Sequence, residues 1–212
     1  MPPQCLRGLR ELCDEHGLML IMDEVQTGVG TTGSAWAYQQ LGVQPDLVAF
    51  SKKAQVGGVM GGGRVDEVPD NVFTVSGRIN STWGGGLTDM VRSRRLLEII
   101  EAEGLIEQAG PKGERLQAGL RTHAAAHGLV DNVRGRGLFV ACDLPDTATR
   151  AALVADLHDV EHVIVLPCGP RSVRFRPALS ITEDEVDEAV AAFGRSLART
   201  AAPARQLQES VR

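Results

Sequence analysis

The feature that most constrains the fold is a pair of short apolar runs, each of which ends near a charged residue. Leu18–Met22 is an unbroken apolar run that stops at Asp23, and Leu47–Phe50 is followed, after one serine, by Lys52. Short runs of this kind are typical of strands buried on both faces of a parallel sheet. Ligands of such sheets bind beyond the carboxyl ends of the strands. We therefore expect a carboxylate and an ammonium beside one crevice.

Composition and charge exclude several classes of partner. The chain has 212 residues, of which 43% are hydrophobic and 23% charged, so about one large domain or two small ones are expected. The formal net charge is −5 and basic residues occur in runs of two at most, which argues against a nucleic-acid partner. No apolar stretch approaches the roughly 20 residues of a membrane helix, and no signal-peptide pattern opens the chain. A cytoplasmic protein without a membrane partner is expected.

The first hundred residues are expected to form part of an α/β domain. Apolar positions at helical spacing predict a helix over Leu6–Cys13, and Ser34 is placed to cap a second helix that ends at Leu41. Together with the two strands, this second helix makes a βαβ unit. Five glycines between residues 57 and 63 predict a flexible loop at a ligand surface.

The rest of the chain predicts two long helices followed by a small α+β domain. The two helices are expected to end at Gly104 and Gly128, and a capping box at Thr182–Glu185 opens the last helix. The elements expected in between and after are strands at Leu129–Val133, Leu138–Asp143, Val163–Leu166 and Val173–Arg176 and helices at Thr149–His158 and Glu183–Leu197. These boundaries divide the chain into residues 1–104, 105–200 and a disordered tail at 201–212.

Three segments, in order along the chain, resemble one family of enzymes. They are Asp23–Gly28 (Asp-Glu-Val-Gln-Thr-Gly), Pro45–Lys52 (ending Phe-Ser-Lys) and Asn80–Gly85 (Asn-Ser-Thr-Trp-Gly-Gly), and they are similar to motifs of the class III pyridoxal-phosphate-dependent aminotransferases. Lys52 follows Asp23 by 29 residues and Thr82 follows Lys52 by 30, as in that family. The resemblance spans about residues 4–198. It implies an α/β fold: part of the large fold-type I domain, with a mostly parallel sheet, followed by a small α+β C-terminal domain.

The resemblance implies roles for five residues. Lys52 would bond covalently to the aldehyde of pyridoxal 5′-phosphate and later carry a proton between substrate and cofactor carbons, and Asp23 would keep the pyridine nitrogen protonated. Gln26 would hydrogen-bond the cofactor's phenolic oxygen and border the substrate. Thr82 would donate to the phosphate of the neighbouring subunit's cofactor, so a homodimer is implied. Arg174 would clamp a substrate carboxylate by a two-pronged hydrogen bond.

Further segments bear on the substrate. Trp36–Gln40, Phe50–Val56 and Arg64–Val68 are most similar to family members that act on the side-chain amine of L-lysine. The implied reaction transfers that amine to 2-oxoglutarate and gives 2-aminoadipate 6-semialdehyde and glutamate, so the implied partners are small amino and keto acids. Family members that use ornithine, 4-aminobutyrate or acetylornithine are the alternatives.

Two other interpretations of the same residues compete. Lys53 is a second amine next to Lys52, and only the spacing to Asp23 favours Lys52. Gly28–Gly33 match the G-x-G-x-x-G fingerprint of dinucleotide-binding proteins. In that fingerprint the first glycine closes the strand and an acid ends the second strand, whereas here other residues intervene and Asp46 begins the second strand. A dinucleotide site is therefore disfavoured.

Chain length also bears on function. Members of the family run to about twice this length, so the resemblance implies that the half carrying the glycine-rich phosphate cradle is absent. An inactive truncated fragment is then the alternative to an active aminotransferase. In that case, the strands at Leu18–Met22 and Leu47–Phe50 are expected to have unpaired edges and exposed apolar faces. No metal site is expected, because the two histidine pairs at i,i+4 spacing lack a third ligand type.

Overall fold

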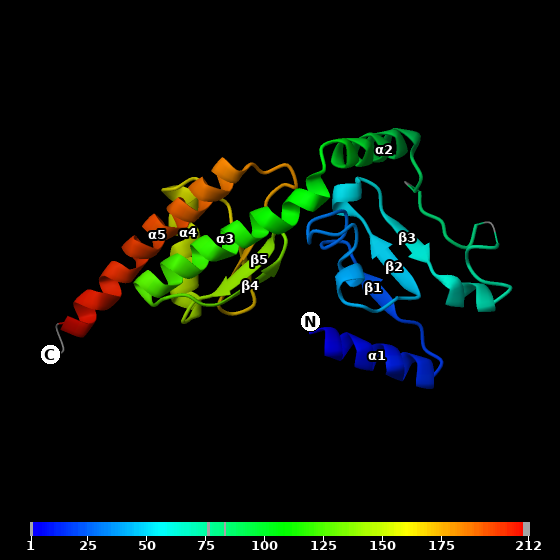
Figure 1. Cartoon of the computed structure of the whole chain (residues 1–212), viewed down its shortest axis with the longest axis horizontal. Coiled ribbons are helices and arrows are strands. Elements are labelled where there is room, and N and C mark those ends of the chain that lie inside the picture. The colour runs from blue at the N-terminus through cyan, green and yellow to red at the C-terminus, as the bar shows by residue number, and fades with distance from the viewer. Residues whose placement is uncertain (1, 76, 83, 210–212) are drawn as a thin grey trace. The chain divides into compact units, whose positions relative to one another are not determined.

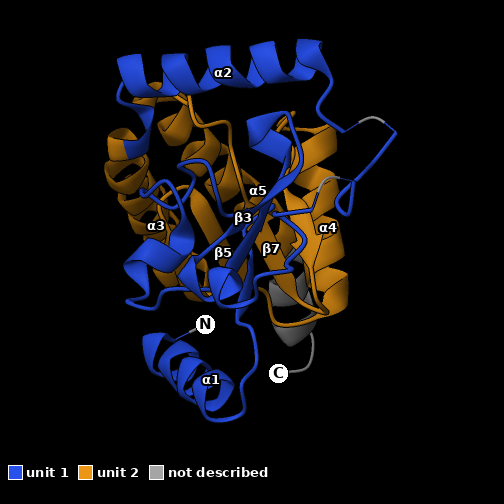
Figure 2. Cartoon of the chain, turned by 90° about the vertical axis from the view of Figure 1, so that its right-hand side faces the viewer, with its two compact units in different colours: residues 1–106 blue, residues 107–212 orange. Residues whose placement is uncertain are grey.

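The computed structural model describes residues 2–75, 77–82 and 84–209, and for residues 202–209 it describes the backbone alone. The chain divides into unit 1 (residues 1–106) and unit 2 (residues 107–212), coloured blue and orange in Figure 2. Unit 1 contains α1 (Pro3–Glu15), β1 (Ile21–Asp23), β2 (Leu47–Phe50), β3 (Gly58–Gly61), α2 (Leu87–Ala102) and the 3-10 turns η1 (Ala37–Gln40), η2 (Lys52–Ala54) and η3 (Gly63–Glu67). Helix α3 (Leu105–His127) begins at the end of unit 1. Unit 2 continues with β4 (Asp131–Arg136), β5 (Phe139–Asp143), α4 (Thr147–Asp159), β6 (Leu166–Cys168), β7 (Ser172–Phe175) and α5 (Glu183–Glu209).

The sheet of unit 1 has the strand order β1-β2-β3 (Figure 1). Strands β1 and β2 are parallel, with Ile21 opposite Leu47, so the two expected strands lie side by side. The expectation that β2 has an unpaired edge is wrong, because Gly58–Gly61 pairs antiparallel with it. Glycine is depleted in strands, which is why the sequence predicts a loop there. Within the described residues, β1 forms an open edge of this sheet.

Helix α1 packs on the sheet through a small apolar cluster and one buried carboxylate. The cluster consists of Leu6, Leu20, Leu41 and Val43. Arg10 donates to the Asp46 carboxylate at 2.8 Å, and the backbone N–H of Leu20 donates to the same oxygen at 2.7 Å. Burial raises the pKa of Asp46, but the hydrogen bonds from Arg10 and Leu20 outweigh this and hold the pKa below its usual value. One carboxylate therefore joins the helix to the starts of both strands.

Several apolar side chains of unit 1 are exposed. Ile21 in β1 is 59% exposed and Leu18 just before it is 57% exposed. The expectation that this run is buried on both faces is therefore wrong: α1 covers the face of Leu20, and no described residue covers Leu18 or Ile21. Helix α2 likewise presents Leu87, which is 84% exposed, and Val91, which is 69% exposed. The exposed apolar faces that the resemblance leads us to expect are present among the described residues.

The connection between β1 and β2 is a loop with one 3-10 turn, where the sequence predicts an α-helix over Ser34–Leu41. The side-chain amide of Gln40 donates to the backbone oxygen of Thr32 at 2.7 Å and to the hydroxyl of Ser34 at 2.9 Å. The backbone N–H of Tyr38 donates to the carboxylate of Glu24 at 2.8 Å. Side chains thus bind the backbone groups that a longer helix would pair internally. The expected cap at Ser34 does not form, because η1 begins at Ala37.

Unit 2 is an antiparallel sheet, in the order β4-β5-β7-β6, with three helices packed on one face. The order of elements is as expected, but one strand is displaced: β6 covers Leu166–Cys168, where the sequence predicts Val163–Leu166. Alternate residues of the central strands face the core, which is a consequence of the two-residue period of a strand. These residues are Val140, Cys142, Val173 and Phe175, and they pack with apolar residues of α3, α4 and α5. No helix among the described residues is long and apolar enough to cross a membrane.

Helix α5 is longer than the sequence predicts. It continues through residues 201–209, where a disordered tail is expected. Three alanines and two glutamines in this stretch are strong helix formers, and no glycine ends the helix. Pro203 lies within it, so local propensity does not by itself explain why the helix continues.

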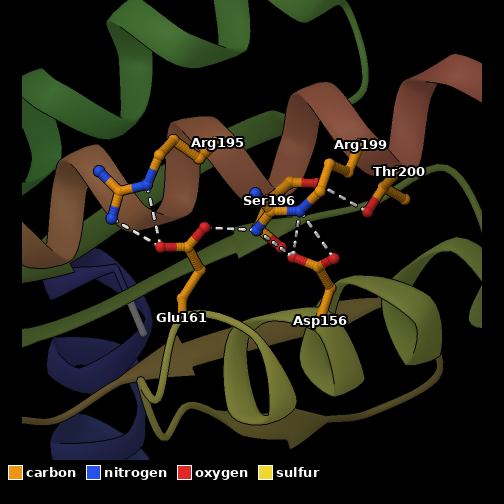
Figure 3. A network of polar contacts seen from close by, with 6 residues as sticks. All are labelled: Asp156, Glu161, Arg195, Ser196, Arg199 and Thr200. Atoms are coloured by element: carbon orange, nitrogen blue, oxygen red, sulfur yellow. Dashed lines mark hydrogen bonds and ion pairs between the residues drawn. The ribbon is translucent and has the colours of Figure 1, made fainter.

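A charged network joins α4 to α5 (Figure 3). Arg199 donates to the carboxylate of Asp156 at 2.6 Å, and Arg195 donates to that of Glu161 at 2.6 Å. Arg199 also reaches Glu161, so one guanidinium bridges both carboxylates. The hydrogen bond from Arg199 lowers the pKa of Asp156, and those from Arg195 and Arg199 lower that of Glu161. The network fixes α5 against the end of α4 while both acids are ionised.

Candidate active site

Strands β1 and β2 end at the same edge of the unit 1 sheet (Figure 1). Asp23 is the last residue of β1 and lies opposite Ala49, whose backbone oxygen accepts from the N–H of Glu24 at 2.9 Å. Lys52 follows the end of β2 by two residues and begins the turn η2. The carboxylate and the amine selected from the sequence therefore emerge from neighbouring ends of parallel strands, which is where ligands of α/β sheets bind.

The backbone of Lys52 is held in an unusual conformation. Its φ angle is 53°, in the left-handed region, which costs a residue other than glycine about 1–3 kcal/mol. The turn is held by Gln55, whose backbone N–H and side-chain amide donate to the Lys52 backbone oxygen at 2.8 Å and 3.1 Å. The side chain is exposed, and among the described residues its amine makes no hydrogen bond or ion pair. Backbone strain of this kind concentrates at functional sites.

The neighbouring amine, that of Lys53, has different surroundings. Its Nζ donates to the backbone oxygen of Gln26 at 2.8 Å, and the side chain is half-buried. This bond connects the segment after β2 with the segment after β1. Gln26 therefore lies beside the turn that begins with Lys52. The order of residues in the sequence does not predict this contact.

The two adjacent acids at the end of β1 also differ. Glu24 is 1% exposed, and its carboxylate accepts from the backbone N–H of Tyr38 at 2.8 Å and from the hydroxyl of Thr27. Asp23 is exposed, and its carboxylate accepts from the backbone N–H of Val25 at 3.0 Å. Glu24 thus holds the loop together and Asp23 presents its carboxylate outward. Glu24 escaped prediction, although the alternation of faces along a strand was a usable signal.

The remaining two predicted residues lie elsewhere in the chain. Thr82 is exposed in the loop before α2, and Trp83 of the same motif lies outside the described residues. Arg174 is on β7 in unit 2, where its guanidinium carbon lies 5.7 Å from the centre of the Phe139 ring. Arg174 is opposite Ala141 in the sheet, so Phe139 is its diagonal neighbour on the same face. Phe139 was not predicted, because this contact depends on strand register.

The residues of the dinucleotide fingerprint are occupied by structural contacts. Asp46, the nearest acid, is 7% exposed and its carboxylate is bound by Arg10 and by the Leu20 N–H. A Cβ at Gly28 would lie 2.5 Å from the ring of Trp36, so packing against that ring accounts for this glycine. The contacts of Asp46 and Gly28 further disfavour the dinucleotide interpretation.

No group of three or more potential metal ligands occurs within the part of the chain that the structure describes.

Comparison with known proteins identifies the family. A family model of the class-III aminotransferases matches residues 1–197, and the chain belongs to this family. Curated relatives include an L-lysine-epsilon aminotransferase of Streptomyces clavuligerus, 55% identical over 197 residues, and one of Mycobacterium tuberculosis, 57% identical over 196 residues. Each alignment covers 92% of this chain and 43% of the relative. The solved structure of a lysine aminotransferase from M. tuberculosis matches with a TM-score of 0.91 and 56% identity, over 94% of this chain and 46% of that one. The chain therefore spans less than half the length of these relatives.

Enzymes of this family depend on pyridoxal phosphate, and the residues at the strand ends fit that cofactor. Lys52 offers a primary amine for an aldehyde, and Asp23 offers a carboxylate for a pyridine nitrogen. Gln26 offers an amide for a phenolic oxygen. All three groups come from the two segments that the Lys53 bond joins.

Proposed function

We propose that the protein transfers the side-chain amine of L-lysine to 2-oxoglutarate with pyridoxal phosphate as cofactor, giving 2-aminoadipate 6-semialdehyde and glutamate. The observation that carries this proposal is the placement of Lys52 and Asp23 beyond the adjacent ends of two parallel strands. Identities of 55% and 57% to proteins named L-lysine-epsilon aminotransferases support the choice of lysine. Because the chain covers 43% of those relatives, the activity is proposed for the whole protein and the residue roles for this chain.

The proposed roles follow from the chemistry of each group. When bound, pyridoxal phosphate supplies an electron sink for the carbon that loses a proton. Lys52 would hold the cofactor through a covalent bond from its amine to the aldehyde carbon, with the aldehyde oxygen leaving as water, and once freed by the substrate amine it would be the base that moves a proton from one carbon to another. Asp23, oriented by the Val25 N–H, keeps a proton on the pyridine nitrogen by its negative charge. Gln26 hydrogen-bonds the phenolic oxygen and borders the substrate.

Two further residues are proposed to complete the site in a homodimer. Arg174 binds the carboxylate of the amino or keto acid through two parallel N–H bonds. Thr82 donates its hydroxyl to the phosphate of the cofactor held by the partner subunit. The exposure of Thr82 in this chain is compatible with a role between subunits.

Borohydride reduction tests the assignment of the amine. The chain is mixed with pyridoxal phosphate, reduced, digested and mapped by mass spectrometry. We expect the label on Lys52, and none on the Lys52→Ala variant, while Lys112→Ala serves as a control that keeps the label. A label on Lys53, or no label on a chain shown to be folded, contradicts the proposal.

The amino donor is tested separately. The identity of 40% to an acetylornithine aminotransferase of Thermosynechococcus vestitus makes that activity the second candidate. Glutamate formed from 2-oxoglutarate is measured with lysine, acetylornithine and 4-aminobutyrate as donors. We expect lysine to be favoured by about tenfold or more, because a site built to hydrogen-bond one substrate rejects a donor that leaves those groups unpaired. A labelled chain that forms no glutamate with any donor identifies an inactive fragment.

A further inference from the structure

Lys53 has a position that the proposed chemistry does not use. Its amine reaches across to the backbone oxygen of Gln26 at 2.8 Å, a residue 27 positions earlier in the sequence. We propose that Lys53 is a positioning residue, whose ammonium fixes the loop after β1 against the turn after β2. The bond thereby sets where Gln26 stands relative to Lys52.

The turn at η2 explains how two adjacent lysines acquire different tasks. Lys52 begins the turn with a left-handed φ, and Lys53 lies within the turn, so the two residues leave the backbone in different conformations. The left-handed φ of Lys52 and the bonds from Gln55 to its backbone oxygen hold this turn in place. Lys52 is consequently exposed, while Lys53 is half-buried against the loop.

The loop after β1 is held at its start by other contacts. The N–H of Glu24 donates to Ala49, and the Glu24 carboxylate binds Thr27 and the N–H of Tyr38. These bonds anchor the first residue of the loop to the sheet and to η1. At Gln26 the loop meets the segment after β2 through Lys53. Loss of this bond is therefore expected to loosen residues 25–28 while the end of β1 stays in place.

The chemistry of the bond predicts which substitutions preserve it. The donor is charged, and hydrogen bonds to charged groups are worth more than neutral ones. The acceptor is a backbone oxygen, so the bond does not use the Gln26 amide that the proposed function assigns to the cofactor. An arginine at position 53 keeps a charged donor, whereas a methionine keeps the apolar stem and removes the donor.

The test compares Lys53→Met and Lys53→Arg with the unmodified chain. Lys112→Met is the matched control, because Lys112 also donates one hydrogen bond, to Gln108 at 2.9 Å in unit 2. Hydrogen exchange is measured for residues 24–30, and the dissociation constant of pyridoxal phosphate is measured by its absorbance. Lys53→Met is expected to speed exchange at residues 25–28 and to weaken cofactor binding, each by about tenfold, with the borohydride label still on Lys52. Lys53→Arg is expected to restore both, and Lys112→Met to change neither.

The inference rests on the proposed function only where the dissociation constant of pyridoxal phosphate is measured. The outcomes therefore distinguish failure of the inference from failure of the proposed function. Unchanged exchange at residues 25–28 in Lys53→Met overturns the inference, whatever happens to cofactor binding. Faster exchange without any change in the dissociation constant also overturns it, because the bond is then structural only. If the unmodified chain takes no label on Lys52, the proposed function fails, and the exchange data alone decide whether Lys53 holds the loop.

Discussion

The two units of this chain differ in how much of their sheet is covered by helices. In unit 2 the inward faces of the strands are covered by three helices, and core residues such as Leu120, Leu153 and Phe193 are 0% exposed. In unit 1 the buried cluster has four members, and Ile21 and Leu87 are 59% and 84% exposed. The unit that carries the candidate catalytic residues is therefore the one whose apolar surface the described residues leave uncovered. Unit 2 therefore has the larger buried core, and unit 1 carries the residues proposed for catalysis.

The largest expected effect is the loss of stability caused by a substitution in the core of unit 2. Phe193 packs edge-on against Phe175, with ring centres 5.6 Å apart. Phe193→Ala is expected to lower the free energy of unfolding of unit 2 by about 3–5 kcal/mol, because it leaves a cavity. Urea denaturation followed by hydrogen exchange in each unit measures the change.

The matched substitution in unit 1 is Ile21→Ala. Exposed substitutions usually change stability by less than about 0.5 kcal/mol, and that is the result expected here. A cost similar to that of Phe193→Ala would break the comparison, because Ile21 would then be covered in solution.

The next effect is a pH dependence of unit 2. Burial raises the pKa of Asp143, but hydrogen bonds from Ser172, Asn132 and Arg134 outweigh it and lower the pKa to about 2. A lowered pKa stabilises the fold above the unfolded value near 4, and this contribution is lost as the pH falls from about 4 towards 2. Asp143 is expected to contribute on the order of 2 kcal/mol at neutral pH. The difference between wild type and Asp143→Asn, measured by denaturation at each pH, should shrink over that window and stay constant above it.

The two units also differ in how far the sequence predicts them. In unit 2 the order of strands and helices follows from local patterns, and the capping box forms as expected: the Thr182 N–H donates to Glu185 at 2.7 Å. In unit 1 the parallel pairing of β1 and β2 follows from their apolar runs, but β3 does not, because glycines form it. The edge placement of Asp23 and Lys52 was predictable. The bonds from Tyr38 to Glu24 and from Lys53 to Gln26 were not, because they join residues 14 and 27 positions apart, and the alternation of faces signals only that Glu24 is buried.

A smaller effect is expected at the start of α5. The Thr182 hydroxyl accepts from the Glu185 N–H at 3.2 Å, which satisfies one of the free donors of the first turn. Thr182→Ala is expected to destabilise unit 2 by roughly 1 kcal/mol, and Thr182→Ser to restore most of this. Thermal unfolding measures both. Equal stability of all three proteins would show that tertiary packing alone holds this helix end.

The smallest effect concerns the aromatic ring beside Arg174. A cation over a ring contributes about 0.5–1 kcal/mol at an exposed site. Phe139→Leu is therefore expected to weaken the binding of 2-oxoglutarate about threefold, and Phe139→Tyr to preserve it. Isothermal titration measures both constants. Equal affinity in wild type and Phe139→Leu would show that the ring does not orient Arg174.

The central claim is that Lys52 and Asp23 hold opposite sides of one pyridoxal phosphate molecule. Nitrogen-15 NMR of cofactor labelled at the pyridine nitrogen tests it most directly, in the unmodified chain and in Asp23→Asn. We predict a protonated nitrogen in the unmodified chain and, in Asp23→Asn, a resonance shifted towards the unprotonated form, with the borohydride label on Lys52 in both. Identical resonances in the two proteins, or an unprotonated nitrogen in the unmodified chain, would contradict the account.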